Sequence, residues 1–113
     1  MKKSNEEKIN ENILAQMQMT EQVLKNISMQ KQVFQAEVIE TNNALDELKK
    51  NKDDVFKIIG SIMFKSNKES LQKELEKKID ILDLRLKSIE KQEKELKERV
   101  LKQRDELLKT IQK

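Results

Sequence analysis

One segment interrupts an otherwise helical pattern in this chain, and it contains the only glycine: Val55-Phe56-Lys57-Ile58-Ile59-Gly60-Ser61-Ile62-Met63-Phe64-Lys65. The dipeptide Gly60-Ser61 fits a two-residue hairpin turn whose first central residue requires a positive φ. Residues with high strand propensity flank this turn on both sides. We therefore predict a β-hairpin over residues 55–65. The expected pairs are Ile59 with Ile62, Ile58 with Met63, Lys57 with Phe64, and Phe56 with Lys65.

Both faces of the predicted hairpin are largely apolar. Strand alternation gives two sets of apolar residues: Val55, Ile59, Ile62 and Phe64 on one face, and Phe56, Ile58 and Met63 on the other. A hairpin that faced solvent on one side would show one polar face. An isolated two-stranded hairpin is only marginally stable in water, and both of its edges have unpaired backbone groups. We therefore expect the hairpin to associate with hairpins of other chains. The alternative is one continuous helix, since a single glycine costs a helix only about 1 kcal/mol.

On either side of this segment, a series of twelve positions follows steps of three and four, and eight positions in each series are apolar, which is the pattern of a coiled-coil seam. The first series is Asn10, Ile13, Met17, Thr20, Leu24, Ile27, Lys31, Phe34, Val38, Thr41, Leu45, Leu48. The second series is Leu71, Leu75, Lys78, Leu82, Leu86, Ile89, Glu93, Leu96, Val100, Gln103, Leu107, Thr110. We predict helices over about 5–52 and 67–112, each roughly 65–70 Å long.

The predicted fold class is mainly α: a long antiparallel two-helix coiled coil with a single β-hairpin at its bend, forming one domain over residues 1–113. Ser66 and Glu69 fit a capping box at the start of the second helix. Two seam positions are charged, Lys31 and Glu93. We hypothesise that they pair across the seam and help to fix its register. The alternative is that both side chains extend into solvent.

Composition excludes several classes of function. The chain has 113 residues, of which 40% are charged and 3% aromatic, with a mean hydropathy of −0.85, which is typical of long helices. The net charge is +3, but the two signs are interleaved, as over residues 91–99, which favours a solvated helix face over a nucleic-acid patch. The sequence has neither cysteine nor histidine, so disulfides, the usual zinc sites and Ser-His or Cys-His catalysis are excluded for the chain acting alone.

We therefore expect no enzyme activity, no cofactor and no metal. A single glycine cannot form a glycine-rich phosphate loop. No apolar run approaches the roughly 18 residues of a membrane span, and the first ten residues lack the apolar core of a secretory signal. The expected location is the cytoplasm, with no membrane and no nucleic-acid partner.

Apolar residues exceed the needs of the seam near both ends of the chain. They are Ile9, Ile13, Leu14, Met17 and Met19 near the start, and Leu101, Leu107, Leu108 and Ile111 near the end. A two-helix tip cannot bury all of them, and methionine suits varied partners. The functional interpretation is a binding tip for exposed apolar segments of other proteins. The alternative is a locally widened seam or a further oligomer contact.

The segment around Gly60 resembles the β-type subunit of prefoldin. Two helical stretches share this resemblance: Leu71-Gln72-Lys73-Glu74-Leu75 and Ile89-Glu90-Lys91-Gln92-Glu93. The α-type subunit has a second hairpin, and this sequence has room for one. In its short length and lack of a trailing tail the chain looks more like an archaeal β subunit than a eukaryotic one.

The resemblance implies a hexamer of two α and four β subunits, in which the hairpins join into a β-barrel. Its coiled-coil tips would hold non-native client proteins and pass them to a group II chaperonin without ATP. The expected client-binding residues are Ile9, Ile13, Leu14, Met17, Leu101, Leu107, Leu108 and Ile111. The expected oligomer residues are Val55, Phe56, Ile58, Ile59, Gly60, Ile62, Met63 and Phe64. The alternatives are a structural coiled-coil tether or scaffold with one defined partner, and a helical nucleic-acid-binding adaptor.

Overall fold

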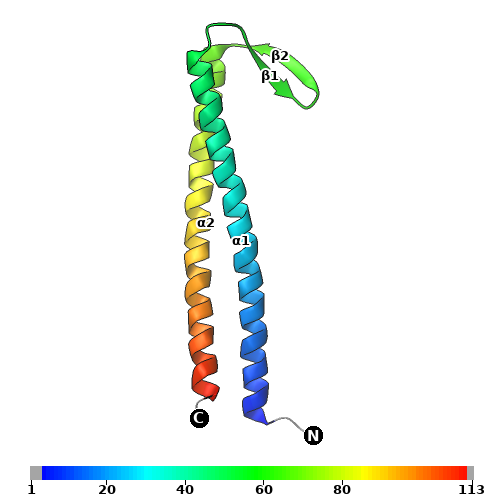
Figure 1. Cartoon of the computed structure of the whole chain (residues 1–113), viewed down its shortest axis with the longest axis vertical. Helices are drawn as coiled ribbons and strands as arrows, with labels where there is room; N and C mark the ends of the chain where they lie inside the picture. Colours follow the sequence, from blue (N-terminus) through cyan, green and yellow to red (C-terminus); the bar gives the residue numbers. More distant parts are fainter. Residues whose placement is uncertain (1–3, 112–113) are drawn as a thin grey trace. The chain divides into compact units, whose positions relative to one another are not determined.

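The computed structural model describes residues 4–111 (Figure 1). The elements follow the order α1 (Asn5–Lys50), β1 (Val55–Ile59), β2 (Ile62–Ser66) and α2 (Lys68–Ile111). The predicted fold class is confirmed: the described chain is mainly helical, and its bend is a two-stranded antiparallel hairpin. The alternative of one continuous helix is wrong.

The chain divides into two compact units. The terminal unit contains α1 up to Lys31 and α2 from Ser88 onward. The hairpin unit covers residues 32–87, with the end of α1, both strands and the start of α2. Each unit therefore contains one stretch of each helix, and only the second contains the sheet.

The register of the hairpin agrees with the predicted pairing at every pair. Ile59 lies opposite Ile62, and the ladder continues to Val55 opposite Ser66. Gly60 has φ 60°, and no described residue other than glycine has a positive φ. A positive φ at the first central residue alone is the signature of a type II′ turn, whose twist suits a hairpin. The single glycine therefore stands where the backbone requires it.

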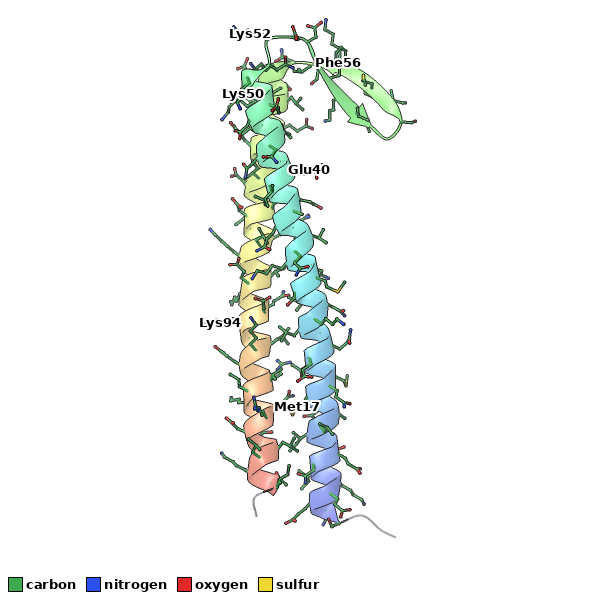
Figure 2. The ribbon with its side chains drawn as sticks, viewed as in Figure 1. Met17, Glu40, Lys50, Lys52, Phe56 and Lys94 are labelled. Atoms are coloured by element: carbon green, nitrogen blue, oxygen red, sulfur yellow. The ribbon has the colours of Figure 1, made fainter. Side chains whose placement is uncertain are left out.

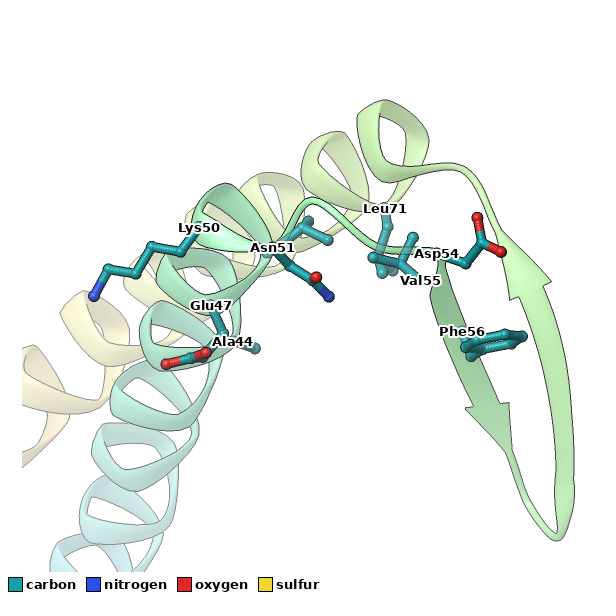
Figure 3. Close-up of a pocket in the computed structure, with 9 residues that line it drawn as sticks. Ala44, Glu47, Lys50, Asn51, Asp54, Val55, Phe56 and Leu71 are labelled. Carbon is teal, nitrogen blue, oxygen red and sulfur yellow. The ribbon is translucent and has the colours of Figure 1, made fainter.

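The buried core of the hairpin unit begins at the root of the hairpin and continues along the two helices. Leu45, Leu48, Val55 and Leu82 are all buried, and Leu82 is only 2% exposed. Figure 3 shows Val55 beside Leu71, at a pocket that Leu48 and Phe56 also line. Val55 thus belongs to the core of its own chain, whereas the rest of the hairpin stays exposed.

Side-chain caps define the helix ends. The Ser4 hydroxyl accepts a hydrogen bond from the Glu7 amide at 3.2 Å at the start of α1. At the start of α2, Asn67 Oδ1 accepts from the amides of Glu69 at 2.9 Å and Ser70 at 3.3 Å. The predicted cap at Ser66 is wrong, because Ser66 pairs with Val55 as the last residue of β2. The ladder extends one residue further than predicted, so the next residue becomes the cap.

The end of α1 is tied to the start of α2. Lys68 Nζ donates to the carbonyl oxygens of Lys49 at 3.3 Å and Asn51 at 2.9 Å. A cation is favourable there because the last carbonyls of a helix have no partner in the helix and carry partial negative charge. Asn51 Oδ1 also accepts from the Asp53 amide at 2.9 Å, which shapes the turn into β1.

The predicted seam is confirmed along α1, where all twelve positions of the first series are buried or half-buried. In α2 the prediction is wrong at one position: Lys78 is exposed, and the neighbouring Ile79 is half-buried instead. The seam therefore steps by four from Leu75 to Ile79, which a helix of 3.6 residues per turn accommodates. The two buried threonines, Thr20 and Thr41, donate to carbonyl oxygens one turn back at 2.9 and 2.7 Å.

Replacement of Gly60 by alanine is expected to loosen the hairpin. A Cβ at Gly60 would meet no atom within 4 Å, so the cost comes from the positive φ alone, about 1–2 kcal/mol. Backbone amides of Ile59 and Ile62 are then expected to exchange with solvent about tenfold faster. Hydrogen exchange followed by NMR measures this, with Ser61→Ala as the control. Equal exchange in Gly60→Ala and Ser61→Ala would contradict the assigned turn.

Candidate functional site

The hairpin presents an exposed apolar surface. Six of its side chains are between 49% and 66% exposed, and we call them the hairpin surface: Phe56, Ile58, Ile59, Ile62, Met63 and Phe64. Figure 2 shows the side chains along both strands. Two ion pairs hold the root of the hairpin: Lys57 with Glu74 of α2, and Lys65 with Asp54 at 3.5 Å. The surface is therefore anchored at its root and uncovered on its faces.

The structure divides the predicted client-binding residues into two groups. Five of them are between 45% and 61% exposed, and we call them the terminal apolar residues: Ile9, Leu14, Leu101, Leu108 and Ile111. The other three, Ile13, Met17 and Leu107, are half-buried seam residues, and Met17 lies between the two helices (Figure 2). All eight belong to the terminal unit.

A groove runs along one flank of the terminal unit, which we call the flank groove. Its volume is about 360 Å³. It is lined by Gln16, Met19, Thr20 and Val23 of α1 and by Leu96, Arg99 and Gln103 of α2. The sequence pattern places Thr20, Leu96 and Gln103 in the seam. Gln16, Val23 and Arg99 were not predicted as site residues. The signal for Val23 was its position one turn after the off-seam Met19.

The seam of the terminal unit is polar in places. Asn10 Oδ1 and Gln103 Oε1 are buried and have no hydrogen-bond partner within residues 4–111. A buried acceptor without a partner costs about 1–3 kcal/mol. Of the buried apolar residues in the described chain, Ile89 alone belongs to this unit. Within the described residues, the terminal unit therefore has fewer buried apolar side chains than the hairpin unit.

Lys31 and Glu93 pair across the seam, which confirms the hypothesised contact. Lys31 Nζ lies 3.2 Å from Glu93 Oε1, and the Ser28 hydroxyl donates to Glu93 Oε2 at 3.2 Å. Lys97 Nζ approaches the same carboxylate at 3.6 Å. The hydrogen bond from Lys31 is the main reason that the pKa of Glu93 lies below its usual range; Ser28 and Lys97 act in the same direction, and burial opposes them.

Residues 4–111 contain no cluster of three or more acidic, histidine or cysteine side chains placed to hold a metal ion. Neither described helix combines the length and the apolar character that crossing a membrane requires.

Comparison with known families identifies the architecture. A family model described as "Prefoldin subunit" matches residues 11–113. The chain belongs to the prefoldin family. The resemblance seen in the hairpin segment is thereby confirmed, and the chain is a prefoldin subunit.

Relatives of this prefoldin subunit cover most of its length. The prefoldin subunit beta of Thermococcus kodakarensis is 38% identical over 78% of this chain and 77% of its own. That of Methanothrix thermoacetophila is 36% identical over 89% of this chain and 86% of its own. The crystal structure of the prefoldin beta subunit from Thermococcus strain KS-1 matches with a TM-score of 0.80 at 32% identity, covering 87% of this chain and 88% of that one.

Acid is expected to weaken the terminal unit of this prefoldin subunit through Glu93. Because the folded state lowers the pKa of Glu93, the unfolded state binds more protons near the usual carboxyl pKa. The stability from this group is thus complete above that value and is lost as pH falls through the lowered pKa. Glu93→Gln should lower the urea midpoint at pH 7 and have a much smaller effect near pH 3, as followed by circular dichroism.

The matched control is Glu90→Gln, an exposed glutamate one turn earlier on α2. Its stability should follow that of the wild type at both pH values. Equal losses for Glu93→Gln at pH 7 and pH 3 would show that the ion pair contributes nothing to the pH dependence.

Proposed function

We propose that this prefoldin subunit is a β-type subunit of an ATP-independent chaperone that holds non-native proteins. The terminal apolar residues carry this proposal, because they are exposed and serve neither the seam nor the hairpin. Exposed apolar side chains on a soluble scaffold mark surfaces for protein binding. The relatives named prefoldin subunit beta support the assignment to the β type.

Assembly is proposed to use the hairpin surface. The sheet has two strands, so both of its edges have unpaired backbone groups, and its faces are apolar. Pairing with strands of other subunits would give these backbone groups hydrogen-bond partners. We place the hairpins of two α-type and four β-type subunits in a shared β-barrel. This role includes Phe56, Ile58, Ile59, Gly60, Ile62, Met63 and Phe64, while Val55 supports the hairpin from inside its own chain.

Client capture is proposed to depend on several subunits acting at once. Each terminal unit offers a few side chains, so its individual affinity is low. Linked weak contacts raise the overall affinity by about 10²–10⁴ when the geometry allows simultaneous binding. The clients then pass to a group II chaperonin in the cytoplasm of an archaeon. Ile13, Met17 and Leu107 contribute when the half-buried seam yields to a client.

Charge on the hairpin surface is expected to prevent assembly. The variant Ile58→Lys with Phe64→Lys places two cations on opposite faces of the hairpin, where burial of an unpaired charge is unfavourable. Mixed with the α-type partner, it should remain helical by circular dichroism but fail to form the large complex by native mass spectrometry. The control, Ile39→Lys with Leu84→Lys, changes two exposed apolar residues of the helices and should assemble normally. An unchanged mass for the hairpin variant would rule out the hairpin as the assembly element.

Loss of the terminal apolar residues is expected to abolish protection of clients. We compare the triple variant Ile9→Ser, Leu14→Ser, Leu108→Ser with a control of equal chemistry in the hairpin unit, Val33→Ser, Ile39→Ser, Leu84→Ser. Light scattering of a diluted denatured protein reports aggregation in the presence of each assembled complex. The terminal variant should lose most of the suppression, and the control should keep it.

Two results would contradict the proposal. If the wild-type complex does not suppress aggregation, the chain is not a holdase, and a structural tether with one defined partner becomes the better account. If the control loses as much activity as the terminal variant, clients bind elsewhere. Transfer is tested by adding a group II chaperonin with ATP, which should release the held client.

A further inference from the structure

The flank groove combines apolar and polar chemistry in one place. Met19 is 71% exposed and Val23 is half exposed, and Leu96 contributes from the opposite helix. These three side chains line the apolar part of the groove. Its volume of about 360 Å³ lies at the lower end of ligand pockets, which suits a single large side chain.

The polar side of the groove has unused hydrogen-bonding capacity. Arg99 and Gln103 are four residues apart on α2, so they lie on one helix face. Within residues 4–111, no carboxylate lies at ion-pair distance from Arg99. Gln103 Oε1 is buried and has no hydrogen-bond partner there. Arg99 therefore offers donors at the groove, and the buried acceptor of Gln103, one helical turn further along α2, becomes available when its carboxamide turns into the groove.

We propose that the flank groove binds an extended backbone segment of a non-native protein around one large aliphatic or aromatic side chain. The side chain enters between Met19, Val23 and Leu96. Arg99 donates to a backbone carbonyl of the segment, and Gln103 turns its carboxamide into the groove and accepts from a backbone N–H. This inference rests on the proposed client-binding function and specifies what the client must offer.

The chemistry selects the non-native state. In a folded protein nearly all buried backbone N–H and C=O groups already have partners. An unfolded segment presents a large apolar side chain together with free backbone groups on either side of it. A folded surface with one exposed leucine offers only the first of these. Recognition of both distinguishes an unfolded chain from a merely apolar surface.

Replacement of Gln103 is expected to change stability and client binding in opposite directions. Without a client its oxygen is buried and unpaired, which costs stability, and a client's N–H removes that cost. Gln103→Leu should therefore raise the stability of the assembled protein and weaken binding of the segment. A residue with a purely structural role would move both quantities in the same direction. Gln92→Leu, at an exposed glutamine of α2, serves as the control and should change neither.

The test uses an unstructured 15-residue glycine-serine peptide with one central leucine, and the same peptide with esters in place of the two amides that flank the leucine. Methionine methyl groups labelled with ¹³C report binding to the assembled complex by NMR. The Met19 methyl should shift on titration, while that of Met29, exposed outside the groove, should not. The ester peptide should bind about threefold or more weakly, because it lacks the N–H. Gln103→Leu should remove this difference.

Three results would overturn the inference: no shift of the Met19 methyl, equal affinity for the amide and ester peptides in the wild type, or an unchanged preference in Gln103→Leu. The outcome is separable from the proposed function. If the complex suppresses aggregation but the ester peptide binds as well as the amide, the backbone recognition is wrong and the holdase function stands. If the amide peptide binds in the groove but no aggregation is suppressed, the groove is real and the holdase function is wrong.

Discussion

The two apolar faces of the hairpin are the constraint on which the rest of the structure depends. One chain buries only Val55 at the root, and it leaves six apolar side chains of the same two strands at least about half exposed. Two strands cannot cover both of their faces, and their edges keep unpaired backbone groups. Such a hairpin favours pairing with other chains, which supports the assembly proposed for this prefoldin subunit. The contacts at the root, among them Lys57 with Glu74 and Lys68 with the end of α1, hold the hairpin ready for that assembly.

The buried apolar residues are distributed unevenly between the two units, and this difference suits the separate roles proposed for them, assembly for the hairpin unit and client binding for the terminal unit. The hairpin unit contains most of the buried apolar residues, which gives the assembling part a firm base. The seam of the terminal unit contains the Lys31–Glu93 pair and the unpaired acceptors of Asn10 and Gln103. Polar seam residues specify register at some cost in stability. The same unit keeps apolar side chains exposed outside the seam, where the proposed clients would reach them.

Much of the fold could be predicted because local rules decide it. Gly60 is the only residue that tolerates a positive φ without strain, and strand alternation then sets the whole register. The predicted seam was wrong at Lys78, because the helix continues from Leu75 to Ile79 by a step of four where the sequence series took a step of three. The excess of apolar residues at the ends was also visible in the sequence. The flank groove was not, because it brings Val23 together with Arg99, and no local pattern gives the rotation of two distant helix segments about each other.

Exchange of the edge-facing amides tests the central claim most directly. In a hairpin with a two-residue turn, the residues next to the turn form a hydrogen-bonded pair, so the amides of the following pair, Ile58 and Met63, face the open edges. Hydrogen exchange of these two amides is measured in the isolated chain and in the complex with the α-type partner. The account predicts fast exchange in the isolated chain and strong protection in the complex. Fast exchange of both amides in an intact complex would contradict it, because the hairpin edges would then be unpaired.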